Sequence, residues 1–342
     1  MDKPILSSMH SDWHPRWSQY VHALDRRELS RTGLLLKLVR ESRRHRVVVV
    51  LGMVGLPQGY VDLLAAALIA RRSRPVVVTE CGWEPGSRAF ARLLRRKPPL
   101  GYDPLPAVGA GVVRALIHAF DTDVTHYCVL SEYDRQQFPR AWGIPATRVH
   151  VTPFCYTISD LNGRVTRDGP VFAGGNSSRD YRPLLVAARD LDAPVTVATT
   201  LPLQDVPPNV TAGSIPHAEY ERMTREARVV VVPLLGDTAR SAGQTTYLNA
   251  MALGKPIVVT DSPGVRTYVE HGASGLIVPP DDPAALREAI GWMLDSRNES
   301  EVQRMCERAR QVALERFSPT AYLDAILSVA DAAASGRSAD PQ

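Results

Sequence analysis

The sequence has few cysteines and no long apolar run, and these absences exclude several classes of protein. Its four cysteines, Cys81, Cys128, Cys155 and Cys306, are far apart and form no CxxC pair. That spacing argues against a structural zinc site and against a disulfide framework, so we expect buried thiols. No uninterrupted apolar stretch approaches about 18 residues, so the sequence predicts no membrane-spanning helix.

Charge of one sign is not in large excess either, because the formal net charge is +4 over 342 residues. Arginine doublets nevertheless gather in the first hundred residues, at 26–27, 43–44, 71–72 and 95–96. Such doublets attract anionic lipid or acidic substrates, although solvated helix faces carry them more often. They lack the interleaved aromatic residues of RNA-binding surfaces, so no nucleic-acid partner is expected.

The first residues, MDKPILSSMHSDWH, lack the apolar core of a secretion signal. We therefore expect a cytoplasmic protein. A peripheral position at the inner membrane face stays open, because the predicted helix 88–97 combines Phe90, Leu93 and Leu94 with four arginines and a lysine. The alternative is a core-packed helix with a basic outer face.

Short β-branched runs alternate with helical patterns almost to the end of the chain, which is typical of parallel sheets with crossover helices. The predicted strands are 5–8, 46–51, 75–80, 126–131, 149–154, 170–175, 195–199, 210–214, 229–234, 256–260 and 275–278. The predicted helices are 34–44, 61–71, 88–96, 112–120, 133–142, 181–191, 219–227, 245–253, 265–270, 283–294 and 318–333. The length favours about two domains of this α/β kind.

The text after Phe154 becomes polar and rich in turn residues, CYTISDLNGRVTRDGP, before the alternation starts again. We place the domain boundary in this segment. The predicted domains are an N-terminal domain at 1–157 and a C-terminal domain at 168–317. For the final helix, 318–334, packing against the N-terminal domain is one option.

A strand that begins at Val229 leads into a loop with Ser241, Gly243 and Gln244, and a helix opens near Thr245. Glycine lets the backbone approach a ligand, and the free amides and the dipole at a helix start attract phosphate. This loop therefore predicts an anion site, although a glycine before a helix alone is often a simple cap.

The text NAMALGKPIVVTDSPGV, followed by GASGLIVPPDDPAALREAI, closely resembles the donor domain of the family-four GT-B glycosyltransferases. The resemblance covers 171–317 well and the first half only loosely. It implies the GT-B fold, which has two Rossmann-like, doubly wound parallel-sheet domains with a cleft between them. It also implies transfer of a sugar from a nucleotide-diphosphate sugar, with retention at the anomeric carbon and without a metal or other cofactor.

Two glutamates that this family usually carries eight residues apart are missing. Alignment on the glycine-lysine-proline text puts Ser241 and Asn249 at their positions. The resemblance implies a sugar contact for Ser241 and a ribose contact for Asn249, but neither side chain supplies a carboxylate. A nonenzymatic GT-B module that binds a nucleotide sugar or supports a partner glycosyltransferase is therefore the alternative function.

The turn after strand 170–175 is the second informative stretch, with the text VFAGGNSSRD. It contains Gly174, Gly175 and Asn176. In the family this turn binds the donor diphosphate, and Arg179 is our candidate catalytic residue because a guanidinium holds two phosphate oxygens and stays charged. A surface ion pair with Asp180 or Asp190 is the alternative for Arg179.

The resemblance further places a backbone contact to the nucleotide base at Ile215, in the turn after strand 210–214. The first half should face the acceptor, which we leave open as a small molecule, a lipid-linked saccharide or a polymer. Strand ends in open parallel sheets carry ligands, which selects His10, Glu80 and Trp83. Glu80 is a second catalytic candidate beside an aromatic ring. Capping or ion pairing for Glu80 and simple solvation for His10 are the alternatives.

No metal site is predicted. The D-x-D text at 121–123 precedes a strand, where the family has a structural aspartate. Asp282, in the second acidic pair at 281–282, is interpreted as the cap of helix 283–294.

Overall fold

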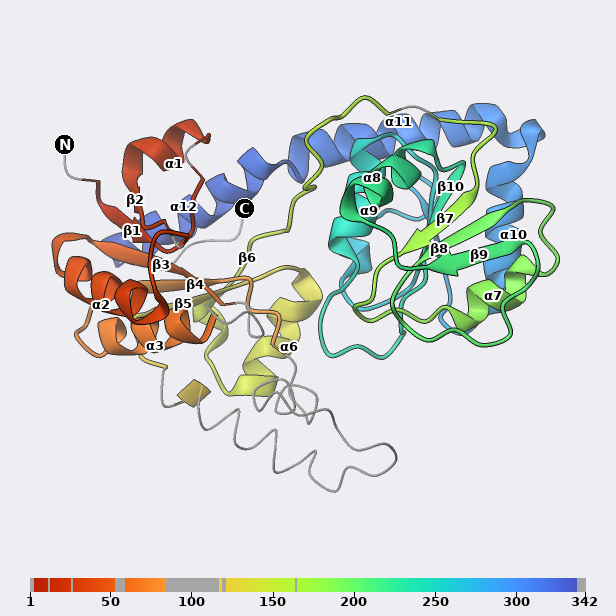
Figure 1. The fold of residues 1–342 in the computed structure, drawn as a ribbon. Helices are drawn as coiled ribbons and strands as arrows, with labels where there is room; N and C mark the ends of the chain where they lie inside the picture. The colour runs from red at the N-terminus through yellow and green to blue at the C-terminus, as the bar shows by residue number, and fades with distance from the viewer. Residues whose placement is uncertain are drawn as a thin grey trace, which may run out of the picture. The chain divides into compact units, whose positions relative to one another are not determined.

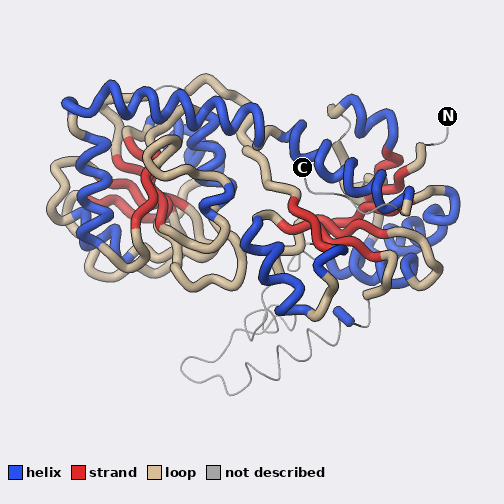
Figure 2. The backbone as a smooth tube through the Cα atoms, turned by 180° about the vertical axis from the view of Figure 1, so that it is seen from behind, coloured by secondary structure: helices blue, strands red, loops and turns tan. Residues whose placement is uncertain are grey.

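The chain folds into two compact units (Figures 1 and 2). This computed structural model describes residues 3–11, 13–25, 27–52, 59–83, 117–118, 121–163 and 165–336. Unit 1 consists of two segments, one that ends at Pro153 and one that begins at Tyr322. Unit 2 is the continuous segment Phe154–Ala321. The predicted helix 88–97 lies outside the described residues.

Unit 1 has a six-stranded parallel sheet in the order β2-β1-β3-β4-β5-β6. Its strands are β1 (Ile5–Ser7), β2 (Val21–Ala23), β3 (Val47–Leu51), β4 (Val76–Thr79), β5 (Thr125–Val129) and β6 (Val149–Val151). Its helices are α1 (Pro15–Tyr20), α2 (Arg31–Glu41), α3 (Gly59–Ala70), α6 (Glu132–Trp142) and the short turns η1 (Ser42–Arg44) and η2 (Ala146–Arg148). The strand order reverses between β1 and β3.

Unit 2 has a second six-stranded parallel sheet, in the order β12-β11-β10-β7-β8-β9. Its strands are β7 (Val171–Gly174), β8 (Val195–Ala198), β9 (Val210–Gly213), β10 (Val229–Val232), β11 (Ile257–Thr260) and β12 (Leu276–Val278). Its helices are α7 (Arg182–Ala188), α8 (His217–Glu226), α9 (Gln244–Ala252), α10 (Pro283–Leu294), α11 (Glu299–Arg316) and the short turns η3 (Val265–Thr267) and η4 (Ser296–Asn298). The last helix, α12 (Pro319–Ser335), belongs to unit 1 from Tyr322 onward.

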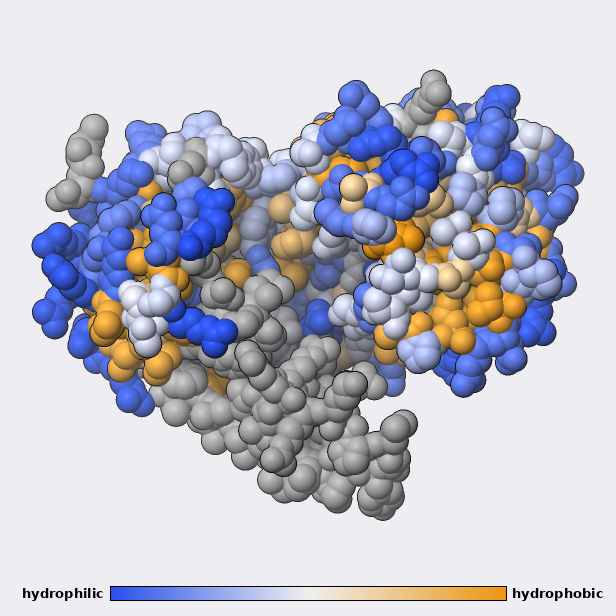
Figure 3. Space-filling view, in the orientation of Figure 1, coloured by the Kyte–Doolittle hydropathy of each residue, from blue (hydrophilic) through white to orange (hydrophobic). Residues whose placement is uncertain are grey.

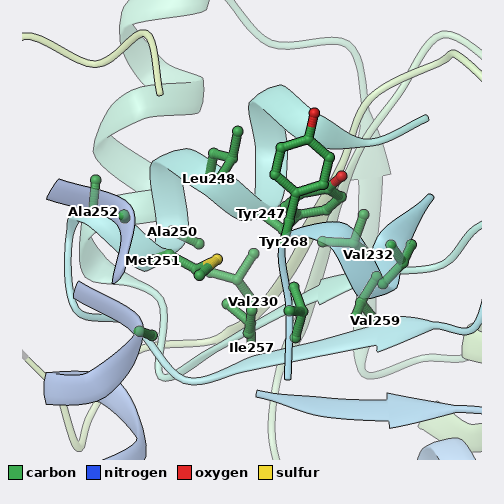
Figure 4. Close-up of a cluster of buried hydrophobic side chains, with 14 of the residues drawn as sticks. Val230, Val232, Tyr247, Leu248, Ala250, Met251, Ala252, Ile257, Val259 and Tyr268 are labelled. Atoms are coloured by element: carbon green, nitrogen blue, oxygen red, sulfur yellow. The ribbon is translucent and has the colours of Figure 1, made fainter. Parts of the chain in front are cut away.

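The sheet of unit 2 is buried on both faces, as the continuous valine runs predict. Along β10, Val230 and Val232 face one apolar cluster, whereas Val229 and Val231 face another. Figure 4 shows the first cluster, in which the strand side chains meet those of α9, including Met251. Apolar clusters therefore cover both faces of the sheet, which leaves the ends of its strands for ligands.

Each predicted strand is present within three residues of its predicted ends. Two helices, α1 and the 18-residue α11, the short strand β2 and the short turns η2 and η4 were not predicted. The predicted helix 265–270 is only the short turn η3. The cap at Asp282 is confirmed, because its Oδ1 accepts from the amide of Ala285 at 2.9 Å.

The segment that follows Pro153 packs as part of unit 2. Thr166 Oγ1 donates to the carbonyl of Ala227 at 2.8 Å, and Arg225 donates to the carbonyls of Asp160 and Asn162. The ammonium of Lys255, whose side chain is fully buried, donates to Thr166 Oγ1 at 3.1 Å. These bonds tie residues 160–166 to unit 2, which begins at Phe154.

All four cysteines are buried thiols, as expected from their spacing. Among the described residues, no helix combines the length and the apolar character needed to cross a bilayer.

A half-buried ion pair anchors the loop before β5. Arg148 donates to both carboxylate oxygens of Asp121, at 2.5 and 2.7 Å, and to the carbonyl of Thr125 at 3.0 Å. The two side chains are only 13% and 14% exposed. The first aspartate of the D-x-D text is therefore engaged in this ion pair.

We predict that Arg148→Met lowers the free energy of unfolding of unit 1 by about 3 kcal/mol, because it leaves the Asp121 carboxylate poorly solvated and unpaired. The matched control is Arg135→Met, which removes an exposed pair with Glu132 and should cost about 0.5 kcal/mol or less. Urea unfolding followed by tryptophan fluorescence measures the difference, since four of the five tryptophans lie in unit 1. Equal losses in the two variants would contradict the prediction.

Candidate nucleotide-sugar site

The predicted donor residues gather at one end of the sheet of unit 2. The strand order reverses between β7 and β10, and ligands of open parallel sheets bind beyond the carboxyl ends of strands at such a point. The turn after β7 is bonded to the loop after β10. The amide of Asp180 donates to the carbonyl of Pro233, and that of Leu235 donates to the carbonyl of Ser178, both at 3.1 Å.

Glycine is required twice in the turn after β7. A Cβ on Gly174 would stand 2.3 Å from the ring of Tyr220. A Cβ on Gly175 would stand 2.9 Å from the guanidinium of Arg179, and Gly175 has φ +111°, a value that L side chains rarely adopt. The two glycines thus let the chain fold closely around Arg179.

Arg179 lies at the centre of this site, held by neutral oxygens. Its Nε donates to the carbonyl of Gly174 at 3.0 Å, and one terminal nitrogen donates to the carbonyl of Ser177 at 2.9 Å. The other donates to Thr246 Oγ1 at 2.9 Å. Burial lowers the pKa of the guanidinium, although an arginine remains charged at neutral pH.

Two phenols complete the surroundings of Arg179. The hydroxyl of Tyr181 donates to the carbonyl of Gly175 at 2.6 Å, and burial raises the pKa of Tyr181 to about 12. The hydroxyl of Tyr220 lies 3.1 Å from Thr246 Oγ1, and burial also raises its pKa. Both phenols are therefore neutral, so they do not compensate the charge of Arg179.

The ion pairs considered as an alternative for Arg179 are formed by other arginines. Asp180 pairs with Arg182 at 2.6 Å, and Asp190 pairs with Arg287 at 2.7 Å. Among the residues that the structure describes, no carboxylate pairs with Arg179. Arg179 is half-buried, and a partly desolvated cation held only by neutral groups is costly unless an anion joins it, so the geometry favours an anionic ligand here.

Helix α9 begins beside Arg179. Gly243 stands before the helix with φ +85° and supplies no side-chain cap. The first amides of a helix lack intrahelical acceptors and carry partial positive charge. The bond from Arg179 to Thr246 places the guanidinium at this first turn. Thr245 is exposed there, whereas Gln244 is buried.

The two residues at the positions of the missing glutamates are engaged within unit 2. Ser241 is 2% exposed and accepts from Nε2 of Gln244 at 2.6 Å. Asn249 Oδ1 accepts from the amides of Thr157 and Ile158, at 2.7 and 3.3 Å. In this geometry Asn249 fastens the segment after the unit boundary to α9. A ribose contact would have to compete with those bonds.

The remaining donor candidates border the same end of the sheet. Asn176 is exposed, and its Oδ1 accepts from Thr199 Oγ1 and from the amide of Thr200, which ties the glycine turn to the loop after β8. Ile215 follows β9 and packs at the margin of the core. Their roles toward a ligand stay predictions.

The acceptor-side candidates lie in unit 1 and differ in their surroundings. His10 is exposed after β1. Glu80 follows β4 with φ +54°, an uncommon value for a non-glycine residue, and its carboxylate accepts from the hydroxyl of Tyr322 at 2.8 Å. Trp83 is 7% exposed and donates to the carbonyl of Gly52 at 2.6 Å. The geometry gives Trp83 a packing role against Trp142 and its neighbours rather than an open stacking surface.

Some side chains around the site were not predicted. Tyr181, Tyr220 and Thr246 surround Arg179, and Tyr322 holds Glu80. These two tyrosines and this threonine are far apart in the sequence and form no recognisable sequence pattern. Tyr322 is 242 residues away from Glu80, so only the folded chain brings them together.

Comparison with known proteins agrees with this architecture. Residues 184–296 match the family described as glycosyl transferases group 1. The chain is 25% identical over 161 residues to alpha-D-kanosaminyltransferase of Streptomyces kanamyceticus, covering 46% of this chain and 36% of that protein. It is 35% identical over 80 residues to D-inositol 3-phosphate glycosyltransferase 1 of Catenulispora acidiphila, covering 23% and 18%. The chain thus spans about a third or less of the length of these curated relatives.

Solved structures match nearly the whole chain. Anabaena HepE in complex with UDP-glucose superposes with a TM-score of 0.62 at 15% identity, covering 97% of this chain and 91% of that one. A glycosyltransferase from Rickettsia africae gives 0.61 at 11% identity, covering 97% and 90%. The fold is that of the GT-B class, with two Rossmann-like units. The match to the group 1 glycosyl transferases lies within unit 2 and agrees with the resemblance seen in the sequence.

We predict that Asn249→Ala lowers the free energy of unfolding of unit 2 by about 1 to 3 kcal/mol without any nucleotide present, because the amides of Thr157 and Ile158 lose their acceptor. Asn249→Asp keeps an acceptor oxygen and should lose less. Urea unfolding followed by circular dichroism compares the three proteins. Unchanged stability together with weaker nucleotide-sugar binding in Asn249→Ala would assign the residue to the ligand instead.

Proposed function

We propose that this protein is a glycosyltransferase that moves a sugar from a nucleotide-diphosphate sugar to an acceptor hydroxyl. The half-buried guanidinium of Arg179, which no described carboxylate pairs with, lies beside the start of α9 and carries the proposal. Support comes from the group 1 family match in unit 2 and from curated relatives whose names describe sugar transfer. Solved structures of the same fold hold UDP or UDP-glucose.

In the proposed reaction Arg179 and the first amides of α9 bind the diphosphate. The bond from the anomeric carbon to the diphosphate oxygen breaks, and a bond from that carbon to the acceptor oxygen forms. Negative charge then grows on the diphosphate, where a fixed cation in a poorly solvated site stabilises it. The acceptor proton passes to a diphosphate oxygen, so the products are the glycoside and the nucleoside diphosphate.

We further propose that the reaction retains the configuration at the anomeric carbon and needs no metal or other cofactor. The family resemblance supports retention. The position of Arg179 supports metal independence, since a guanidinium can neutralise phosphate charge. Glu80 is proposed to act on the acceptor side, because a carboxylate held by Tyr322 at the end of β4 is fixed in orientation. We propose a cytoplasmic location.

A second candidate function rests on the neutral replacements in α9 and its preceding loop. Ser241 and Asn249 are both engaged within unit 2. A module that binds a nucleotide sugar without turnover, or that supports a partner glycosyltransferase, would need Arg179 but no carboxylate at these positions. The two functions differ in turnover, not in binding.

We predict that Arg179→Met reduces transfer, or slow hydrolysis of the bound nucleotide sugar, by about 100-fold or more, since it removes a fixed charge on the leaving group. The matched control is Arg182→Met, three residues along, whose exposed guanidinium pairs with Asp180. It should keep its turnover within a few-fold. Steady-state kinetics of both purified variants, with thermal unfolding to verify the fold, measure this. Unchanged turnover in Arg179→Met would remove Arg179 from the mechanism.

We predict that one of the common uridine, guanosine or thymidine diphosphate sugars raises the melting temperature of the protein and is slowly hydrolysed, with the same rate in EDTA. Thermal shift and nucleotide release measure the two effects. Stabilisation without any turnover, also with candidate acceptors, would favour the nonenzymatic module. Loss of hydrolysis in EDTA would contradict metal independence.

A further inference from the structure

Positive charge is concentrated on two adjacent helices of unit 1 and the turns that follow them. The segments 31–46 and 59–74 together contain nine lysines and arginines but two acidic residues. The basic residues are Arg31, Lys37, Arg40, Arg43, Arg44, Arg46, Arg71, Arg72 and Arg74. The two segments therefore have a net charge of +7, nine positive charges minus two negative ones. Because the whole chain has a net charge of only +4, the rest of the molecule is slightly acidic.

The two acidic residues do little to offset this charge at the surface. Asp62 is fully buried. Glu41 is 20% exposed and lies 3.4 Å from His22. All nine basic residues are exposed, so their field reaches the solvent.

The same helices expose leucines. α2 and α3 pack against each other on one face of the sheet (Figure 1). Leu36 of α2 is 70% exposed, and Leu64 and Leu68 of α3 are 41% and 37% exposed. Figure 3 shows hydrophobic residues at the surface in this region, bordered by strongly hydrophilic ones. Each helix thus carries outward leucines in its middle and arginines at its end.

The arginines of the two helix ends form one group. Arg43 and Arg44 lie in η1 before β3, and Arg72 and Arg74 lie before β4, the neighbouring strand. Arg74 donates to the carbonyl of Arg43 at 3.3 Å, which brings the two turns together. This group lies at the amino ends of β3 and β4, whereas His10 and Glu80 follow the carboxyl ends of their strands.

We propose that this face of α2 and α3 docks onto an anionic lipid bilayer. At a bilayer interface leucines insert below the headgroups while arginines meet lipid phosphates, and about four to eight clustered basic residues suffice for recognition. A soluble polyanion would engage the charges but leave the leucines exposed. The proposal goes beyond sugar transfer, because the docking face contains none of the residues assigned to the donor or the acceptor.

The test is co-sedimentation of the purified full-length protein with vesicles of equal parts phosphatidylglycerol and phosphatidylcholine, or of phosphatidylcholine alone. We expect binding to the anionic vesicles only, and its loss near 1 M salt, where the Debye length is about 3 Å. Arg43→Glu/Arg44→Glu should weaken the partition coefficient at least about tenfold. Leu36→Ser/Leu64→Ser/Leu68→Ser should weaken it by a similar factor, because less apolar surface is buried.

The matched control is Arg304→Glu/Arg308→Glu, the same charge change on exposed positions of α11, which should bind as the unaltered protein does. Hydrolysis of the nucleotide sugar by the same variants should be unchanged, so failure of docking is distinguishable from failure of the proposed function. Three results would overturn the proposal: no binding to anionic vesicles, equal losses in the control variant, or full binding by the leucine variant.

Discussion

The site in unit 2 depends on one electrostatic constraint, the presence of a half-buried arginine that no described carboxylate balances. Arg179 is held by the carbonyls of Gly174 and Ser177 and by Thr246. Those contacts exist only because two loops from neighbouring strands are bonded to each other at the point where the strand order reverses. Each neighbouring feature favours an anion. The two glycines leave space for it, the neutral phenols do not offset the charge of Arg179, and the free amides at the start of α9 add positive potential.

Helix α9 contacts both Arg179 and the segment that follows Pro153. Its first turn touches Arg179 through Thr246, and one turn later Asn249 binds the amides of Thr157 and Ile158. The position to which the family resemblance assigns a ligand-binding carboxylate therefore holds an amide, which anchors the segment that leaves unit 1. An amide is suited to this exchange, because it accepts from backbone amides without a charge that would have to be buried.

The glycine turn and the helix start selected from the sequence lie together, and their role toward an anion stays a prediction. The sequence predicted the strands well, because buried valine runs are local signals. It did not predict α11, although Val302, Met305, Ala309 and Val312 recur with helical spacing and are buried; the many charges between them obscured the pattern. The environment of Arg179 and the anchoring by Asn249 were beyond prediction, since they join residues 67 and 92 positions apart. Trp83 was selected as an acceptor-side residue because a strand end alone does not show what will cover the ring.

Unit 1 is built from two stretches of chain with the whole of unit 2 between them. Its last strand ends at Val151, but α12 from Tyr322 onward, with buried side chains as far as Ala333, also belongs to this unit. During synthesis the ribosome adds the intervening residues over roughly 10 to 30 seconds at ordinary rates. During that time the sheet of unit 1 lacks α12. Unit 2 is continuous in the chain and is made before most of α12, so the sheet of unit 1 exposes apolar surface that chaperones can hold until α12 has been made.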